Sequence, residues 1–139
     1  MKTRLRFLVL VLALLAGCAT PFRAPPDVAH ITLVRVGSPL VAVEKIWLER
    51  KAGPLVVTGY VVERLAAADT SGTHLDVTLF DAAGRGLRAT VEHFEPRQIN
   101  SRFRRHNDAT YRVPLDPLPP GTVRIEVRAH EGAHGSGPG

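Results

Sequence analysis

The segment Thr122–His130, TVRIEVRAH, decides the fold class of this chain. Its apolar residues Val123, Ile125, Val127 and Ala129 alternate with polar ones. Successive side chains of a β-strand point to opposite faces of the sheet. Strict alternation along this segment therefore predicts a strand with one face in a core and the other toward solvent.

The same period of two recurs along the chain, interrupted by turn residues. The other segments expected to form strands are His30–Val36, Val41–Arg50, Pro54–Arg64, His74–Phe80, Leu87–Phe94 and Tyr111–Leu115. The alternation slips near Lys45, which suggests either a β-bulge or a strand that crosses between two sheets. No segment has a sustained helical stripe of apolar residues. We therefore expect an all-β fold.

The connections between these segments support an antiparallel arrangement. Asp81–Gly86 has the composition of a tight turn and predicts a hairpin. In the strand after it, we expect Leu87, Ala89 and Val91 to point inward. Pro114 should confine its strand to a sheet edge, because proline donates no backbone hydrogen bond. Together these features predict a single antiparallel, immunoglobulin-like β-sandwich of about seven strands.

The N-terminus has the layout of a secretory signal: cations in Met1–Arg6, then the apolar run Phe7–Ala16. The end of this run, Leu15-Ala16-Gly17-Cys18, resembles the lipobox of bacterial lipoproteins. The resemblance implies cleavage before Cys18 and lipidation of that cysteine. It divides the chain into a signal peptide (1–17), a lipidated cysteine with an extended linker (18–27), a β-sandwich domain (28–131) and a flexible, glycine-rich tail (132–139).

The lipobox resemblance also implies a location and narrows the chemistry. It places the protein in the cell envelope, anchored in the membrane through the lipid on Cys18. Ala19 follows the cysteine where aspartate would favour the inner membrane, so we expect the outer membrane, with the domain facing the periplasm. Removing Lys2, Arg4 and Arg6 with the signal lowers the net charge from +5 to +2. A nucleic-acid partner is not expected at so small an excess of positive charge.

A second resemblance concerns the domain itself. Val77–Gly84 and Leu118–Gly121 are similar to the strand-turn motifs of FxLYD-type, immunoglobulin-like domains of bacterial surface proteins. Phe80 stands where that family has tyrosine. The resemblance implies the sandwich fold and assigns no functional residues.

The sequence favours a protein that is not an enzyme and needs no cofactor. The serines fall in expected loops or in the tail, without a nucleophile-elbow pattern. No glycine-rich phosphate loop opens a helix. Six histidines leave a metal-ion binder open as an alternative. His74 and His130 are expected to point outward, but no spacing fixes a metal site. Trp47, Tyr60 and Tyr111 are expected in the core or between the sheets.

The segment Pro96–Asp108 is the most distinctive part of the domain. It contains the candidate ligand-binding residues Arg97, Arg102, Phe103, Arg104, Arg105 and His106. Guanidinium groups suit phosphate, sulfate or carboxylate, and an aromatic ring among them can stack on a ligand. The alternative is a solvated loop, because 15 of the 18 basic residues are arginine and clusters then arise from composition.

These observations lead to two hypotheses. The first is a membrane-anchored, non-catalytic module that binds or scaffolds another envelope protein. The alternative is a lipoprotein that binds an anionic envelope molecule, such as a lipid headgroup or a glycan, through Arg97–Arg105, or a metal ion through histidines.

Overall fold

A computed structural model describes residues 23–50, 53–99 and 108–132. It is all-β, with two sheets and one short 3₁₀ helix in the described residues. The elements are η2 (Pro26–Val28), β1 (Thr32–Val36), β2 (Val41–Arg50), β3 (Leu55–Glu63), β4 (Thr73–Phe80), β5 (Gly86–Glu92), β6 (Asp108–Pro114) and β7 (Arg124–Glu131). The expected strand segments are thus strands, with ends that differ by a few residues.

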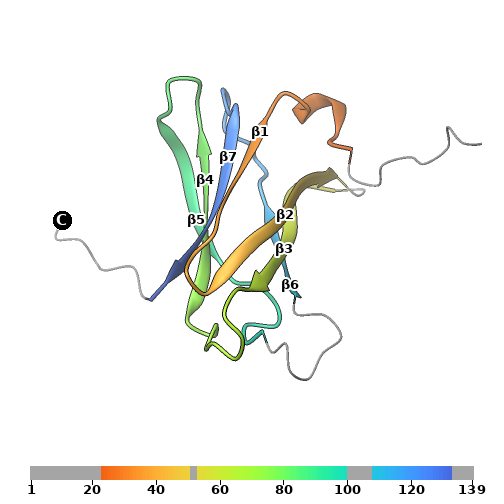
Figure 1. The fold of residues 1–139 in the computed structure, drawn as a ribbon. Helices are drawn as coiled ribbons and strands as arrows, with labels where there is room; N and C mark the ends of the chain where they lie inside the picture. Colours follow the sequence, from red (N-terminus) through yellow and green to blue (C-terminus); the bar gives the residue numbers. More distant parts are fainter. Residues whose placement is uncertain (1–22, 51–52, 100–107, 133–139) are drawn as a thin grey trace, which may run out of the picture.

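The strands form two sheets that lie face to face (Figure 1). The four-stranded sheet has the order β1-β7-β4-β5, and the three-stranded sheet has the order β2-β3-β6. The expectation of a purely antiparallel arrangement is wrong for one pair, because β1 runs parallel to β7. The two strands lie far apart in the sequence, so no hairpin fixes their relative direction.

The core lies between the sheets and is built as the alternation predicts. Ile125, Val127 and Ala129 of β7 are buried, whereas Arg128 and His130 are exposed. The predicted hairpin between β4 and β5 is confirmed. In its turn the Asp81 carboxylate accepts hydrogen bonds from the backbone N–H groups of neighbouring residues. These bonds, those from Arg85 foremost, lower the pKa of Asp81.

Strand β5 has the opposite orientation to the one expected. Ala89 and Val91 pair with Thr78 and Asp76 on the outer face, and Val91 is 47% exposed. Leu87 is also exposed and lies at a bulge, where the register with β4 shifts. Arg88, by contrast, reaches across the rim of the sandwich and donates hydrogen bonds to the carbonyl oxygens of Leu115 and Pro117. The alternation predicted that Arg88 points to solvent. Its long cationic side chain instead lies along the open edge between the two sheets.

The phase slip near Lys45 is a bulge, located between Val43 and Lys45 in the pairing of β2 with β3. The buried Tyr111 spans the core side of this bulge, where its hydroxyl donates to the Lys45 carbonyl oxygen at 3.1 Å. Gly59 lies beneath the Tyr111 ring, opposite it in the β3–β6 register. The bulge, the tyrosine and the glycine therefore form one packed unit.

We expect Tyr111→Phe to change how stability depends on pH. Burial raises the pKa of Tyr111 above its ordinary value, so above about pH 10 the unfolded chain loses a proton that the folded chain keeps. The stabilising effect of Tyr111 is therefore fully present below pH 10 and declines above it. At neutral pH the variant should lose about 1 kcal/mol with the hydrogen bond. Urea unfolding at pH 7 to 11 should show this difference shrinking as pH rises; a constant difference would contradict the argument.

The two ends of the sandwich carry different parts of the chain. Helix η2, the Asp81–Gly86 turn and the ends of β2 and β6 lie at one end, called here the entry end (Figure 1). Pro26 and Asp27, expected in the extended linker, already form η2, and Asp27 pairs with Arg50 of β2 at 3.2 Å. The β3–β4 connection, the end of β5 and the start of β6 lie at the opposite end, the distal end.

Candidate functional site

The clearest candidate site lies on the outer face of the three-stranded sheet. It consists of Lys45 and Trp47 on β2, Tyr60 on β3 and Arg112 on β6, and is called here the Trp47 surface. The Trp47 and Tyr60 rings lie 5.4 Å apart, tilted by 51°. Both aromatic side chains are half-buried, while Lys45 and Arg112 are exposed. Rigid aromatic rings beside cations on a sheet are a typical composition for a binding surface.

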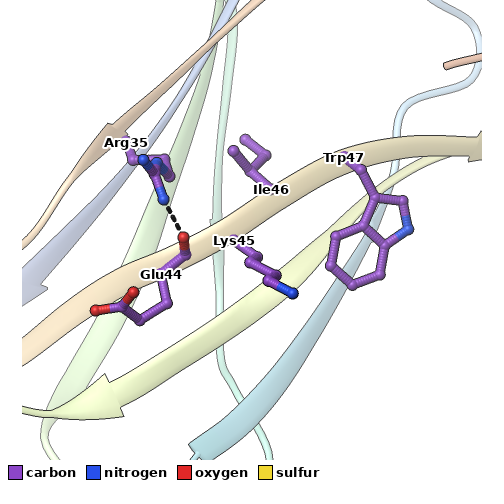
Figure 2. A pocket seen from close by; sticks show the side chains of 5 residues that line it. All are labelled: Arg35, Glu44, Lys45, Ile46 and Trp47. Atoms are coloured by element: carbon purple, nitrogen blue, oxygen red, sulfur yellow. Dashed lines mark hydrogen bonds between the residues drawn. The ribbon is translucent and has the colours of Figure 1, made fainter. Parts of the chain in front are cut away.

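The strand register explains why these rings face outward. Leu48 pairs with Val57, and both are buried in the core, so the adjacent Trp47 must lie on the opposite face. Figure 2 shows Lys45 and Trp47 on one side of β2 and Ile46 on the other. The expectation that Trp47 and Tyr60 lie in the core is therefore wrong, whereas it is confirmed for Tyr111. Counting the alternation back by one residue from Leu48 would have predicted the outward position.

Two contacts of charged side chains lie on either side of the Trp47 surface. Arg112 forms an ion pair with Glu49, which lies next to Trp47 on the same outer face. On the other side, the Arg35 guanidinium of β1 donates to the Glu44 carbonyl oxygen and so bridges the two sheets (Figure 2). Both contacts hold the surroundings of the aromatic pair in place.

The hollow next to Trp47 is small. It has a volume of about 210 Å³ and is lined by Arg35, Glu44, Lys45, Ile46 and Trp47 (Figure 2). Pockets that enclose a small molecule usually measure about 300–1,000 Å³. The geometry favours contact with a surface of another molecule over enclosure of a small ligand.

Two of the histidines, His74 and His130, lie side by side. His74 and His130 face each other across β4 and β7, with ring centroids 5.2 Å apart. His130 is exposed as expected, but His74 is only 5% exposed although it lies on the outer face. Its Nε2 lies 3.6 Å from the Asp76 carboxylate. In the described ranges, no group of three histidine, cysteine, aspartate or glutamate residues is placed to hold a metal ion.

The arginine-rich segment is firmly attached where it begins. Thr70 is the centre of this attachment: its hydroxyl donates to the Arg97 carbonyl oxygen and accepts from the Ile99 N–H, both at 2.9 Å. Ile99 is buried, and the Arg97 guanidinium donates to the Ser71 carbonyl oxygen. The other predicted ligand-binding residues lie outside the described residues: Arg102, Phe103, Arg104, Arg105 and His106.

The predicted lipidation site, Cys18, also lies outside the described residues, as do the signal peptide and most of the tail. In the part of the chain that is described, no helix is long and apolar enough to cross a membrane. No protein-family model matches the chain, and neither a curated protein nor a solved structure matches it significantly. The candidate site therefore rests on the geometry of this chain.

Proposed function

We propose that this protein is a lipid-anchored envelope protein, held in the outer membrane through Cys18, whose domain is a non-catalytic interaction module facing the periplasm. Its partner is another envelope protein. The lipobox resemblance supports the anchor. The main support for an interaction module is the Trp47 surface. It presents an aromatic pair on a sheet, beside a hollow too small to enclose most ligands.

We further propose that the domain is an immunoglobulin-like sandwich. The chain crosses between the two sheets after β1, β3, β5 and β6, with hairpins β2–β3 and β4–β5 inside the sheets. Such alternation of hairpins and crossings is typical of immunoglobulin-like folds. In this domain the first strand, β1, additionally pairs in parallel with the last strand, β7.

The described flanks of the arginine-rich segment favour contact with a partner over contact with the anchoring membrane. Its described flanks, Ile99 and Asp108, lie at the distal end, whereas the linker enters through η2 at the entry end. A strand the length of β4 separates these ends by about 25 Å. Charges are screened over about 8 Å at physiological salt. With the entry end toward the membrane, the distal end lies beyond the field of the headgroups.

A photo-crosslinking experiment tests the proposal. A photoreactive amino acid replaces Tyr60 in the full chain, and products formed in the native envelope are identified with and without Trp47→Ala. We expect a defined protein adduct, which Trp47→Ala weakens by at least tenfold because a central aromatic contact contributes more than about 1.4 kcal/mol. Leu65→Ala is the matched control, since Leu65 is an exposed apolar residue, 61% accessible, away from this surface. An adduct that Trp47→Ala leaves unchanged would rule out the Trp47 surface.

The anionic-ligand alternative predicts a different result. Replacing Arg102, Arg104 and Arg105 together by alanine would abolish binding to anionic lipid or glycan and leave protein adducts intact. That outcome would overturn the interaction module. Calorimetric titration with zinc and copper tests the metal-ion alternative, which requires a saturable heat.

A further inference from the structure

The free edge of β5 differs from the other sheet edges of this domain. In the described residues, β5 pairs only with β4. It lies at the edge of its sheet (Figure 1) and contains neither proline nor lysine. Its register with β4 is regular from Arg88 to Glu92, and its Leu87 and Val91 are exposed. A flat edge with exposed apolar side chains is a template for pairing with another strand.

The other three edge strands carry features that block such pairing. Strand β2 has its bulge and the exposed Glu44 and Lys45. Strand β6 contains Pro114, and Glu95 forms an isolated bridge to Thr110 on its open side. The short β1 sends Arg35 across to β2. Strand β5 also has a bulge, at Leu87, but the stretch from Arg88 to Glu92 after it pairs regularly with β4 and has no further strand beside it in the described residues.

The sequence of β5 is complementary to itself. In an antiparallel pair of two β5 strands with Thr90 opposite Thr90, Arg88 of each copy faces Glu92 of the other, and Ala89 faces Val91. Opposite charges and threonine pairs across strands are both favourable. Shifting the register so that Ala89 faces itself places Arg88 opposite Thr90 and leaves both charges without a cross-strand partner.

The side chains involved are placed for these contacts. Arg88 and Glu92 are half-buried on the rim of the sandwich, where screening by solvent is reduced. Arg88 donates to two backbone carbonyl oxygens, but a guanidinium has five N–H groups and keeps donors for a carboxylate. On the opposite side of the sheet, Ala89 and Val91 would cover each other.

We propose that β5 is a self-pairing edge, through which two copies of this chain form a two-fold symmetric dimer with a continuous eight-stranded sheet. The occupant is a second copy, because the charge pattern of β5 is satisfied by its own sequence in one register. Strand pairing of this length buries less than the roughly 1,200–2,000 Å² of a standard interface, so the dimer dissociates on dilution.

Disulfide trapping in the full chain tests the register. Thr90→Cys places two cysteines directly opposite, about 4.5–5.5 Å apart at Cα, within the range that a disulfide spans. Ala89→Cys is the matched control, because its copies would lie about 7–8 Å apart, beyond that range. Each variant is tested with native Cys18 and with Cys18→Ser, so that a bridge through Cys18 is recognised. We expect a disulfide-linked dimer for Thr90→Cys and at least fivefold less for Ala89→Cys.

Charge reversal provides the second measurement. Glu92→Arg in the Thr90→Cys chain should lower the dimer yield at least fivefold, and adding Arg88→Glu should restore it. Thermal unfolding verifies that each variant is folded, because Arg88 also donates hydrogen bonds to the Leu115 and Pro117 carbonyl oxygens. A folded Thr90→Cys chain that gives no dimer would overturn the proposal. So would equal trapping at Ala89, a folded double variant without recovery, or trapping of a different protein at Thr90.

Discussion

Replacing Gly59 by alanine is expected to destabilise the domain strongly. A Cβ atom at Gly59 would lie 2.7 Å from Cζ of Tyr111 and still closer to the Tyr111 hydroxyl and the Lys45 carbonyl oxygen. The carbonyl belongs to the backbone of the β2 bulge and cannot move without breaking the pairing of β2 with β3. We expect a loss of at least about 3 kcal/mol, a large share of the roughly 5–15 kcal/mol that stabilises a typical domain. Urea unfolding monitored by circular dichroism measures the effect.

Two further variants define the cause of this loss. Gly72→Ala is the control, because a Cβ atom there meets no atom within 4 Å, and we expect it to be nearly neutral. Gly59→Ala combined with Tyr111→Phe removes the hydroxyl clash and leaves the carbonyl clash, so stability should not return. Full recovery in the double variant would show that the bulge is more pliable than its pairing indicates.

Replacing Cys18 by serine is expected to release the protein from the membrane. Serine offers no thiol for a thioether to lipid, and without acyl chains the chain loses about 0.8 kcal/mol of membrane affinity for each methylene group buried in the bilayer. Cell fractionation should show transfer from the membrane to the soluble fraction, and labelled palmitate should no longer be incorporated. Continued incorporation of labelled palmitate would refute lipid anchoring through Cys18.

Ala19→Asp is the companion to that experiment. It keeps the cysteine and should keep the labelled lipid. The lipobox resemblance implies that it moves the protein from the outer to the inner membrane. Separation of the two membranes by density measures the shift, and an unchanged distribution would remove the basis for outer-membrane sorting.

The alternating pattern predicted the strands correctly where one face is fully buried. Strand β7 follows it residue by residue, because Ile125 and Val127 lie between the two sheets. The same rule was wrong for β5, where apolar residues face outward and Arg88 faces the rim. At a sheet edge burial is incomplete, so the rule that apolar means inward loses its physical basis.

The candidate site was likewise predicted only in part from the sequence. The sequence correctly signalled an irregularity at Lys45, but the prediction placed Trp47 in the core although the next residue, Leu48, is the buried one. The anchoring of Arg97 and Ile99 by Thr70 joins segments about 30 residues apart and has no local signal. The sequence therefore indicates an arginine-rich segment but not the end of the domain at which its flanks Ile99 and Asp108 lie.

The parallel pairing of β1 with β7 has a mechanical consequence. The chain enters β1 at one end of the sandwich and leaves β7 at the other, and the two strands are hydrogen-bonded neighbours. A pull that separates the two ends of the chain along these strands loads all the hydrogen bonds between them at once, in shear. A hairpin pulled from its open end would instead break one bond at a time. A domain tethered at its N-terminus and held by a partner near its C-terminus would therefore resist extension, and it could transmit tension without unfolding.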